Sequence, residues 1–336
     1  MLNDLLAERG FILADGATGT NYFDRGLVSG DAPELWNVEA VDRVAGLHRE
    51  FIDAGADMVL TNSFGANSRR LRLHGAEDRA RELNERAAAI ARETADASGR
   101  TVIVAGSIGP SGDLFAPLGE LTYEEAVAVF AEQAAGLRDG GADILWVETM
   151  SAPEEIRAAA DAIADIGLPF VYTASFDTAG RTMMGLAPAA LPALSDSLAQ
   201  TPAGYGANCG VGAPDLLVAV LEIAEAAPDA VLIAKGNCGI PEIKGDHVHY
   251  TGTPELMADY TTLAIDAGAR IIGGCCGTTP EHVAAMRVAM DSHRPDARPT
   301  RESITARLGP MIMKQAAPGT EAGEARSRRR SRRRAS

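Results

Sequence analysis

Residues 270–292 read RIIGGCCGTTPEHVAAMRVAMDS. The run Arg270–Gly274 is short, apolar and rich in isoleucine, which predicts a buried strand. The segment Pro280–Ser292 carries apolar residues at helical spacing and predicts a helix. Two adjacent cysteines, Cys275 and Cys276, lie between them. This stretch is therefore one strand–helix unit with a pair of thiols at the carboxyl end of its strand.

The same strand–helix unit occurs seven more times before it. The strands are continuous apolar runs, as expected for parallel strands that helices cover on the outside. The predicted strands are Phe11–Asp15, Met58–Phe64, Thr101–Ile108, Asp143–Thr149, Phe170–Phe176, Ala203–Cys209, Ala230–Gly236 and Arg270–Gly274. The predicted helices are Val41–Ala54, Glu77–Ala97, Tyr123–Asp139, Pro153–Ile166, Pro188–Gln200, Pro214–Ala226, Thr253–Ala267 and Pro280–Ser292.

Eight consecutive units of this kind predict an α/β fold, a (β/α)8 TIM barrel. The alternative is a doubly wound open sheet. It is disfavoured because the first predicted strand leads into DGATGT, residues 15–20, and not into the G-x-G-x-x-G turn that binds dinucleotides.

Composition limits the domain organisation and the setting. The chain has 336 residues, of which 46% are hydrophobic and 23% charged, enough for one large barrel or two ordinary domains. We predict a barrel over residues 1–310 and a flexible linker with an arginine-rich tail over residues 311–336. Four cysteines do not make a disulfide scaffold, so we expect a reducing, cytoplasmic setting. We expect no membrane span, because no apolar run approaches about 20 residues.

Charge is distributed unevenly along the chain. The formal net charge is −15, and residues 326–336, RSRRRSRRRAS, contribute seven arginines, so the remainder carries −22. A body this acidic disfavours an enzyme that binds nucleic acid. The tail itself is suited to RNA, to an anionic lipid surface or to an acidic partner, and the alternative is a solvated appendage.

Polar residues cluster at the carboxyl ends of the predicted strands, where barrels of this type carry their active sites. Cys209, in Asn208-Cys209-Gly210, ends the sixth strand, and Cys275 and Cys276 follow the eighth. Three thiolates hold Zn²⁺ with one coordination position open, which is the arrangement of a catalytic site. The alternative is that these cysteines are small buried apolar residues. Further candidates are Asp15 after the first strand, Thr61 after the second and Glu148 at the end of the fourth.

The motifs DGATGT, GANCGVG (206–212) and GGCCGTTPEHV (273–283) together resemble the homocysteine-binding zinc barrel family. That family includes betaine–homocysteine methyltransferase, S-methylmethionine–homocysteine methyltransferase and the homocysteine module of cobalamin-dependent methionine synthase. The resemblance covers about residues 8–292. It implies that Cys209, Cys275 and Cys276 bind zinc and that the thiol of homocysteine takes the open position.

The resemblance also implies substrate contacts. Asp15 and Glu148 match acidic positions that receive the substrate ammonium. Backbone amides around Gly16, Ala17 and Thr18 match the carboxylate site, and Asn237 matches an asparagine near the substrate. Each has a structural alternative: Asp15 stabilises its own loop, and Asn208 and Asn237 tie neighbouring loops together. Cys238 departs from the family pattern and is either a spare ligand or a bystander.

The chemistry follows from the thiol itself. A free alkyl thiol has a pKa near about 8.5, so the reactive thiolate is scarce at neutral pH. Coordination to Zn²⁺ removes the proton. Methyl transfer to that sulfur is then an in-line displacement that requires two aligned reactants.

The methyl donor is less well defined by the sequence. Trp36 matches a tryptophan with which betaine-type relatives face a quaternary ammonium through a cation–π contact. Gly65 and Thr149 stand where the animal betaine enzyme carries tyrosines, and they resemble the methionine-synthase module instead. No D-x-H-x-x-G motif for cobalamin is present.

Three functional hypotheses therefore remain. The first is a zinc-dependent homocysteine S-methyltransferase that uses a small onium compound such as betaine. The second is the homocysteine-activating subunit of a split methionine synthase, with methylcobalamin on a separate protein. The third is a zinc-binding barrel without transferase activity.

Overall fold

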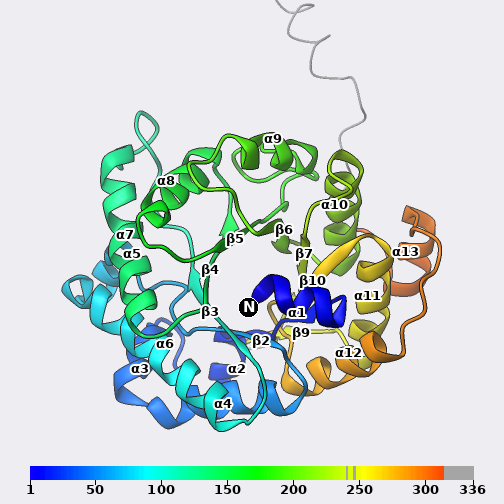
Figure 1. The fold of residues 1–336 in the computed structure, drawn as a ribbon, viewed down its shortest axis with the longest axis horizontal. Coiled ribbons are helices and arrows are strands. Elements are labelled where there is room, and N and C mark those ends of the chain that lie inside the picture. The colour runs from blue at the N-terminus through cyan, green and yellow to red at the C-terminus, as the bar shows by residue number, and fades with distance from the viewer. Residues whose placement is uncertain (240, 245–246, 314–336) are drawn as a thin grey trace, which may run out of the picture.

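The computed structural model describes residues 1–239, 241–244 and 247–313. Eight parallel strands form a barrel with helices around it (Figure 1). Around the ring the order is β1-β10-β7-β6-β5-β4-β3-β2, and a parallel bridge between Ala14 and Met58 joins the first strand to the last. The predicted (β/α)8 barrel is confirmed. The barrel strands are β1 Ile12–Leu13, β2 Met58–Leu60, β3 Ile103–Ile108, β4 Ile144–Met150, β5 Phe170–Ala174, β6 Gly204–Cys209, β7 Leu232–Gly236 and β10 Ala269–Gly274.

Helices form the outer layer (Figure 1). The α-helices are α1 Leu2–Arg9, α2 Gly19–Phe23, α3 Trp36–Glu39, α4 Val41–Asp53, α5 Ser68–Leu71, α6 Ala80–Ala97, α7 Tyr123–Asp139, α8 Pro153–Ala164, α9 Leu191–Asp196, α10 Ala213–Ala226, α11 Pro254–Asp266, α12 Pro280–Ser292 and α13 Arg301–Leu308. The 3-10 turns are η1 Pro33–Leu35, η2 Arg72–His74, η3 Glu77–Arg79 and η4 Pro188–Ala190. Among the described residues, no helix combines the length and the apolar character needed to cross a bilayer.

Two apolar layers hold the barrel together. The larger one lies between the strands and the helices. The smaller one fills the barrel interior and contains Trp146, Met58 and the three leucines of α1. Those leucines, at positions 2, 5 and 6, are buried and share one face of the helix. Figure 1 shows α1 crossing the centre of the ring of strands. Helix α1, which the sequence pattern did not predict, therefore closes one end of the barrel.

Some predicted elements differ in extent. The strand predicted over Met58–Phe64 ends at Leu60, because the polar residues that follow make side-chain hydrogen bonds: Thr61 Oγ1 contacts Ser63 Oγ at 2.6 Å. The helix predicted over Pro188–Gln200 is a 3-10 turn followed by the short α9. Between β7 and α11 the chain forms an antiparallel hairpin, β8 Pro241–Lys244 and β9 His247–Tyr250. The predicted boundary at residue 310 stays a prediction, and residues 314–336, with the arginine-rich segment, lie outside the described residues.

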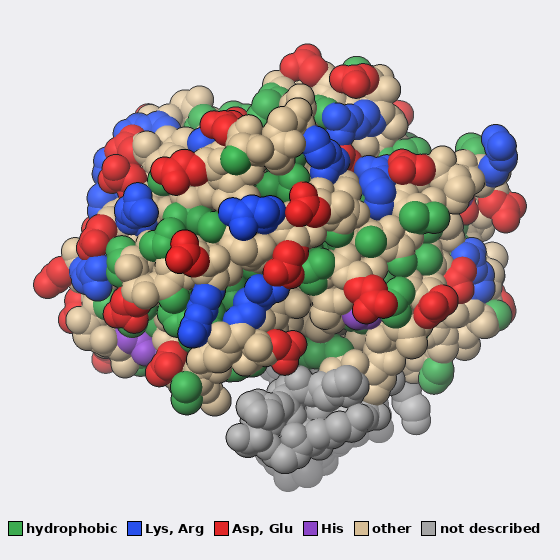
Figure 2. Space-filling view, turned by 90° about the horizontal axis from the view of Figure 1, so that it is seen from below, with side chains coloured by type: hydrophobic (Ala, Val, Ile, Leu, Met, Phe, Trp, Pro, Cys, Tyr) green, Lys and Arg blue, Asp and Glu red, His purple; other side chains and the backbone are tan. Residues whose placement is uncertain are grey.

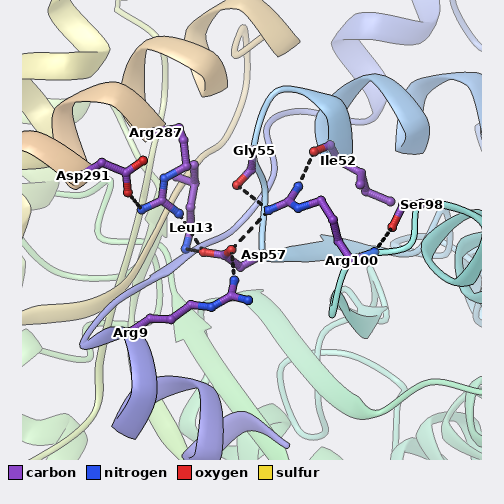
Figure 3. Close-up of polar contacts among 9 residues, drawn as sticks. All are labelled: Arg9, Leu13, Ile52, Gly55, Asp57, Ser98, Arg100, Arg287 and Asp291. Carbon is purple, nitrogen blue, oxygen red and sulfur yellow. Dashed lines mark hydrogen bonds and ion pairs between the residues drawn. The ribbon is translucent and has the colours of Figure 1, made fainter.

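A buried ionic cluster lies at the amino-terminal end of the barrel (Figure 3). Asp57, immediately before β2, is 1% exposed. Its carboxylate contacts three guanidinium groups, those of Arg9, Arg100 at 3.5 Å and Arg287 at 2.9 Å. It also accepts the backbone N–H of Leu13 at 3.1 Å. One carboxylate thus links α1, β1, β2, the segment between α6 and β3, and α12.

The outer surface carries both signs of charge. On the face shown in Figure 2, acidic and basic side chains are interspersed over the helices and do not gather into one patch. The acidic excess of the chain is therefore spread out on this face.

Candidate metal centre and active site

The three candidate metal ligands meet at the carboxyl ends of two strands. Cys209 is the last residue of β6, and Cys275 and Cys276 directly follow β10. Strand β7 lies between them in the barrel. The three Sγ atoms all lie within 4.8 Å of one another, and those of Cys209 and Cys276 are 4.0 Å apart. The structure therefore brings together residues that are more than sixty positions apart in the sequence, and none of the four cysteines forms a disulfide.

Backbone conformation and one asparagine arrange these thiols. Cys209 has a φ of 60°, and Gly210 a φ of 70°. A left-handed conformation is unfavourable for a residue other than glycine and persists only where its surroundings hold it. Asn237 supplies such a restraint: its Nδ2 donates to the carbonyl of Gly210 at 2.8 Å, and its Oδ1 accepts the N–H of Cys276 at 3.0 Å. Asn237 thus links the turn after β6 to the cysteine pair.

The contact among the three sulfurs changes their acidity. Hydrogen bonds from Cys209 and Cys275 lower the pKa of Cys276, because they stabilise its thiolate. A hydrogen bond with Cys209 lowers the pKa of Cys275, but the hydrogen bond with Cys276, burial and the charge of Cys276 outweigh it and raise that pKa. One sulfur of the cluster is thus favoured as an anion even before a metal binds.

A cavity of about 330 Å³ opens beside the cysteines. This volume lies at the lower end of the range for small-molecule sites. Most of the residues singled out from the sequence line it: Gly16, Ala17, Thr18, Thr61, Glu148, Cys209, Cys275 and Cys276. Asp15, Trp36, Asn208 and Asn237 are not among its lining residues.

Glu148, near the end of β4, is a buried carboxyl group on the cavity wall. Its Oε1 accepts a hydrogen bond from the hydroxyl of Ser107. Burial raises the pKa of Glu148 to about 7, and the positive charge of Lys235 opposes that shift. A carboxyl group in this setting gains from a cationic ligand, because the ligand replaces the hydration that burial removes.

Lys235 was missed by sequence reasoning. It lies in β7, its side chain is almost completely buried, and it lines the cavity. Its Nζ donates to the carbonyl of Gly16 at 3.1 Å and lies 3.4 Å from Oδ1 of Asp15. The only signal in the sequence is a lysine inside an otherwise apolar predicted strand.

Asp15 lies behind the cavity wall. Its Oδ2 accepts the N–H of Leu60 at 2.8 Å, and its other oxygen faces Lys235. Burial raises the pKa of Asp15 to about 6, against the opposing effect of Lys235. The ammonium that Asp15 meets in the structure is that of Lys235, and a direct contact between Asp15 and a substrate ammonium stays a prediction.

The loop after β1 is packed tightly. A Cβ at Gly16 would lie 2.5 Å from the carbonyl oxygen of Thr278, so only glycine fits there. The N–H of Ala17 donates to the same Thr278 oxygen at 3.0 Å. Of the backbone amides expected to receive a substrate carboxylate, that of Ala17 is therefore already engaged.

Trp36 does not line this cavity, and its predicted contact with a quaternary ammonium stays a prediction. Its ring packs against Tyr22, with ring centroids 5.1 Å apart, and the guanidinium of Arg43 lies 4.9 Å from its centroid. The side chain is buried in the outer layer. The face of the indole thus already has a cationic partner, and the aromatic rings on the cavity wall are instead those of Phe23 and Phe64.

Asn208 and Thr149 form a reciprocal pair between β6 and β4. The N–H of Thr149 donates to Oδ1 of Asn208 at 2.9 Å, and Nδ2 of Asn208 contacts Oγ1 of Thr149 at 2.7 Å. Thr149 has a φ of 63°, so this pair restrains a strained residue next to Glu148. Thr61 accepts the N–H of Ser107 at 2.9 Å and thereby supports the partner of Glu148.

Comparison with known proteins agrees with the resemblance seen in the sequence. The profile of the homocysteine S-methyltransferase family matches residues 12–290. Methionine synthases of Mycobacterium tuberculosis (strain ATCC 25618 / H37Rv) and Mycobacterium leprae (strain TN) are 31% and 30% identical to the chain, over 91% and 86% of its residues. The chain spans about a quarter of the length of these relatives, 27% and 25% respectively. The metallated form of the homocysteine methyltransferase MmuM from Escherichia coli superposes with a TM-score of 0.71 at 25% identity, covering 85% of this chain and 99% of that chain.

Proposed function

The chain belongs to the homocysteine S-methyltransferase family, and from that membership we propose that it transfers a methyl group to the sulfur of homocysteine and so makes methionine. Family membership makes it a methyltransferase and disfavours a zinc-binding barrel without activity. The observation that carries the proposal is the convergence of three cysteines, a carboxyl group and a lysine on one cavity.

The cysteine cluster fits a zinc ion. At a Zn–S distance of about 2.3 Å, tetrahedral geometry separates two sulfurs by roughly 3.8 Å. The 4.0 Å between Cys209 and Cys276, and the limit of 4.8 Å for all three sulfurs, are compatible with that spacing. Three protein sulfurs would leave the fourth position to a substrate. Zinc bound here would favour the deprotonated, nucleophilic form of a coordinated thiol.

The chain's own residues would orient the acceptor. Glu148 lines the cavity on the same wall as the cysteines and would bind the α-ammonium of homocysteine. The hydroxyl of Ser107 donates a hydrogen bond to that carboxylate, and Thr61 accepts the backbone N–H of Ser107. Asn237 would hold the turn after Cys209 and the backbone of Cys276 in place. Asn208 would restrain Thr149 in its left-handed conformation. Their contribution is alignment of the sulfur with the incoming methyl group.

The side chains that line the cavity favour a small onium compound, such as betaine, as the methyl donor. Glu34 and Glu148 both line the cavity together with three cysteines, whereas Lys235 is the only basic side chain among its described lining residues. A cationic donor would favour the charged form of these two carboxyl groups, whose pKa values burial raises. The rings of Phe23 and Phe64 provide faces over which a quaternary ammonium or sulfonium is stabilised. Transfer of the methyl group would turn the quaternary ammonium of betaine into a tertiary amine, which then takes up a proton from water.

A second candidate is the homocysteine-activating subunit of a split methionine synthase. It is favoured by the mycobacterial methionine synthases, which match nearly the whole of this chain with about a quarter of their own length. In that case methylcobalamin would be brought by a separate protein.

One assay separates the two candidates. Zinc-loaded protein is incubated with homocysteine and betaine without any corrinoid, and methionine is measured by mass spectrometry. Methionine that forms with betaine alone supports a small onium compound as the methyl donor. Methionine that forms only after methylcobalamin is added supports the second candidate, and no methionine with either donor contradicts the proposed reaction. The Cys276→Ala variant is the matched control for metal-independent background.

A further inference from the structure

Strand β7 contains none of the three cysteines, yet its carboxyl end lies between the two segments that carry them. In the sheet register, Gly236 lies opposite Cys209 of β6 and opposite Gly274 of β10, the residue before Cys275. Its carbonyl oxygen accepts the N–H of Cys275 at 2.6 Å. The end of β7 is therefore the backbone against which both cysteine-bearing segments are aligned.

The next residue, Asn237, extends this alignment to the third thiol. Its side chain joins the carbonyl of Gly210 to the N–H of Cys276. The sulfurs of Cys209 and Cys276 are 4.0 Å apart, close to the roughly 3.8 Å of a tetrahedral zinc site. Ligands held near the metal-bound spacing lose little conformational freedom when a metal binds, which raises the affinity. The end of β7 thus preorganises the thiols.

Gly236 is held in turn by Tyr260, a tyrosine that the proposed chemistry does not use. Tyr260 lies in α11, in the outer layer beside β10 (Figure 1), and its side chain is completely buried. Its hydroxyl accepts the N–H of Gly236 at 3.0 Å. A Cβ at position 236 would lie 3.0 Å from Cζ of this ring and 3.2 Å from its hydroxyl oxygen, so a glycine permits the close approach. The phenol therefore fixes the end of β7 from the helix layer.

We propose that Tyr260 is a positioning residue of the metal centre, because through Gly236 it sets the spacing of the two segments that carry the thiols. This inference rests on the zinc site of the proposed function. Tyr260 is not among the described residues that line the cavity, so it acts through the backbone of β7. Groups that orient metal ligands from outside the coordination sphere contribute about 10- to 100-fold to metal affinity.

The test measures zinc affinity without homocysteine or a methyl donor. The metal-free full chain is titrated with Zn²⁺ in competition with a chromophoric chelator. Tyr260→Phe, which removes only the hydroxyl, should weaken zinc binding roughly 10- to 100-fold. The absorption bands of the Co²⁺-substituted variant should also differ from those of the wild type, because these bands report the geometry of the ligands. A wild-type zinc affinity, or a Co²⁺ spectrum identical to that of the wild type, would overturn the inference.

Two other buried tyrosines are matched controls. The hydroxyl of Tyr172 contacts the carbonyl of Leu191 at 3.1 Å and Oγ of Ser195 at 2.7 Å, both in α9. The hydroxyl of Tyr22 has no hydrogen-bond partner among the described residues.

In urea denaturation of the metal-free protein, Tyr172→Phe should lower the free energy of unfolding about as much as Tyr260→Phe does, yet it should leave zinc affinity unchanged. Tyr22→Phe should leave both quantities nearly unchanged. Equal losses of zinc affinity in Tyr172→Phe and Tyr260→Phe would show a general effect of stability, which overturns the inference. A wild type that binds no zinc would instead overturn the proposed metal site.

Discussion

Buried carboxyl groups have different charged neighbours at the two ends of the barrel. At the amino-terminal end, Asp57 meets three guanidinium groups and one backbone N–H (Figure 3). At the carboxyl-terminal end, Asp15 and Glu148 are close to a single ammonium, that of Lys235, next to three thiols. Cations outnumber the carboxylate at the first end, and acidic groups outnumber the cation at the second. The first arrangement suits a structural role. The second leaves an excess of acidic groups, which a charged ligand can balance.

The largest expected effect tests the ligand end. Cys276→Ala should remove zinc binding and lower methyl transfer at least about 1,000-fold, because two thiolates do not complete a catalytic site. The free energy of unfolding of the metal-free protein should change by about 1 kcal/mol or less, since the side chain is only half buried. Metal analysis, product formation and urea denaturation measure the three quantities. Full zinc occupancy in this variant would contradict the assignment of the ligands.

The next prediction tests the structural end. Asp57→Asn should lower the free energy of unfolding by about 3–5 kcal/mol, because it leaves three guanidinium groups without their shared partner. Homocysteine affinity per folded molecule should not change, since the cluster lies at the opposite end of the barrel. Urea denaturation measures the free energy of unfolding, and calorimetry on the same preparation measures the affinity for homocysteine. A loss of affinity at unchanged stability would break the contrast between the two ends.

A third kind of buried ionisable group leaves one polar atom without a hydrogen-bond partner among the described residues. His48, in α4, is 1% exposed, its Nε2 has no hydrogen-bond partner among the described residues, and burial lowers its pKa to about 4. Between pH 6.5 and pH 4, His48 therefore binds a proton in the unfolded chain but not in the folded chain. His48 thus costs no stability above about pH 6.5, and roughly 3 kcal/mol is lost as the pH falls to 4.

A comparison of the wild type with His48→Gln separates the effect of His48 on stability from the effects of the buried carboxyl groups. Asp15 and Glu148, whose pKa values are raised, change stability in the opposite direction over the same range. The difference in unfolding free energy between wild type and His48→Gln cancels their contribution. That difference should shift in favour of the variant on acidification, and a difference that stays constant from pH 7 to pH 4 would show that His48 has the same pKa in the folded and the unfolded chain.

The smallest expected effect concerns Glu148. Glu148→Gln should weaken homocysteine binding about 10- to 100-fold, because a neutral amide replaces the carboxylate that faces the ammonium. The desamino analogue 4-mercaptobutanoate should bind the variant at least as well as the wild type. Calorimetry with both ligands decides the matter. Equal losses for the two ligands would mean that Glu148 acts only through the architecture of the cavity.

The barrel was predictable because its signal is repeated. Each of the eight strands is an apolar run that a helix follows, so an error in one unit does not alter the pattern. Helix α1 was not predicted, because a helix of eight residues with three apolar positions resembles an ordinary chain end. The strand after Asp57 was predicted too long, because Thr61 and Phe64 have good strand propensity, whereas the side-chain hydrogen bonds of Thr61 and Ser63 are visible only in the fold.

The site was predictable where residue type alone carries the chemistry. Three cysteines and a glutamate at strand ends indicate a thiol site in any barrel, and the structure places all four on one cavity. Lys235 was missed because a single lysine in a strand is usually solvated, and only the register shows that it faces Asp15. Trp36 was placed by analogy of position, and its actual partners, Tyr22 and Arg43, come from separate elements.

The leucines of α1 have a kinetic consequence. Since they fill the amino-terminal end of the barrel interior, both reactants of the proposed reaction would enter the described cavity from the carboxyl ends of the strands. The amino acid whose sulfur reaches the cysteines would sit beneath the methyl donor, so it would arrive first and depart last. Steady-state kinetics should then be sequential and ordered, with the donor product leaving before methionine.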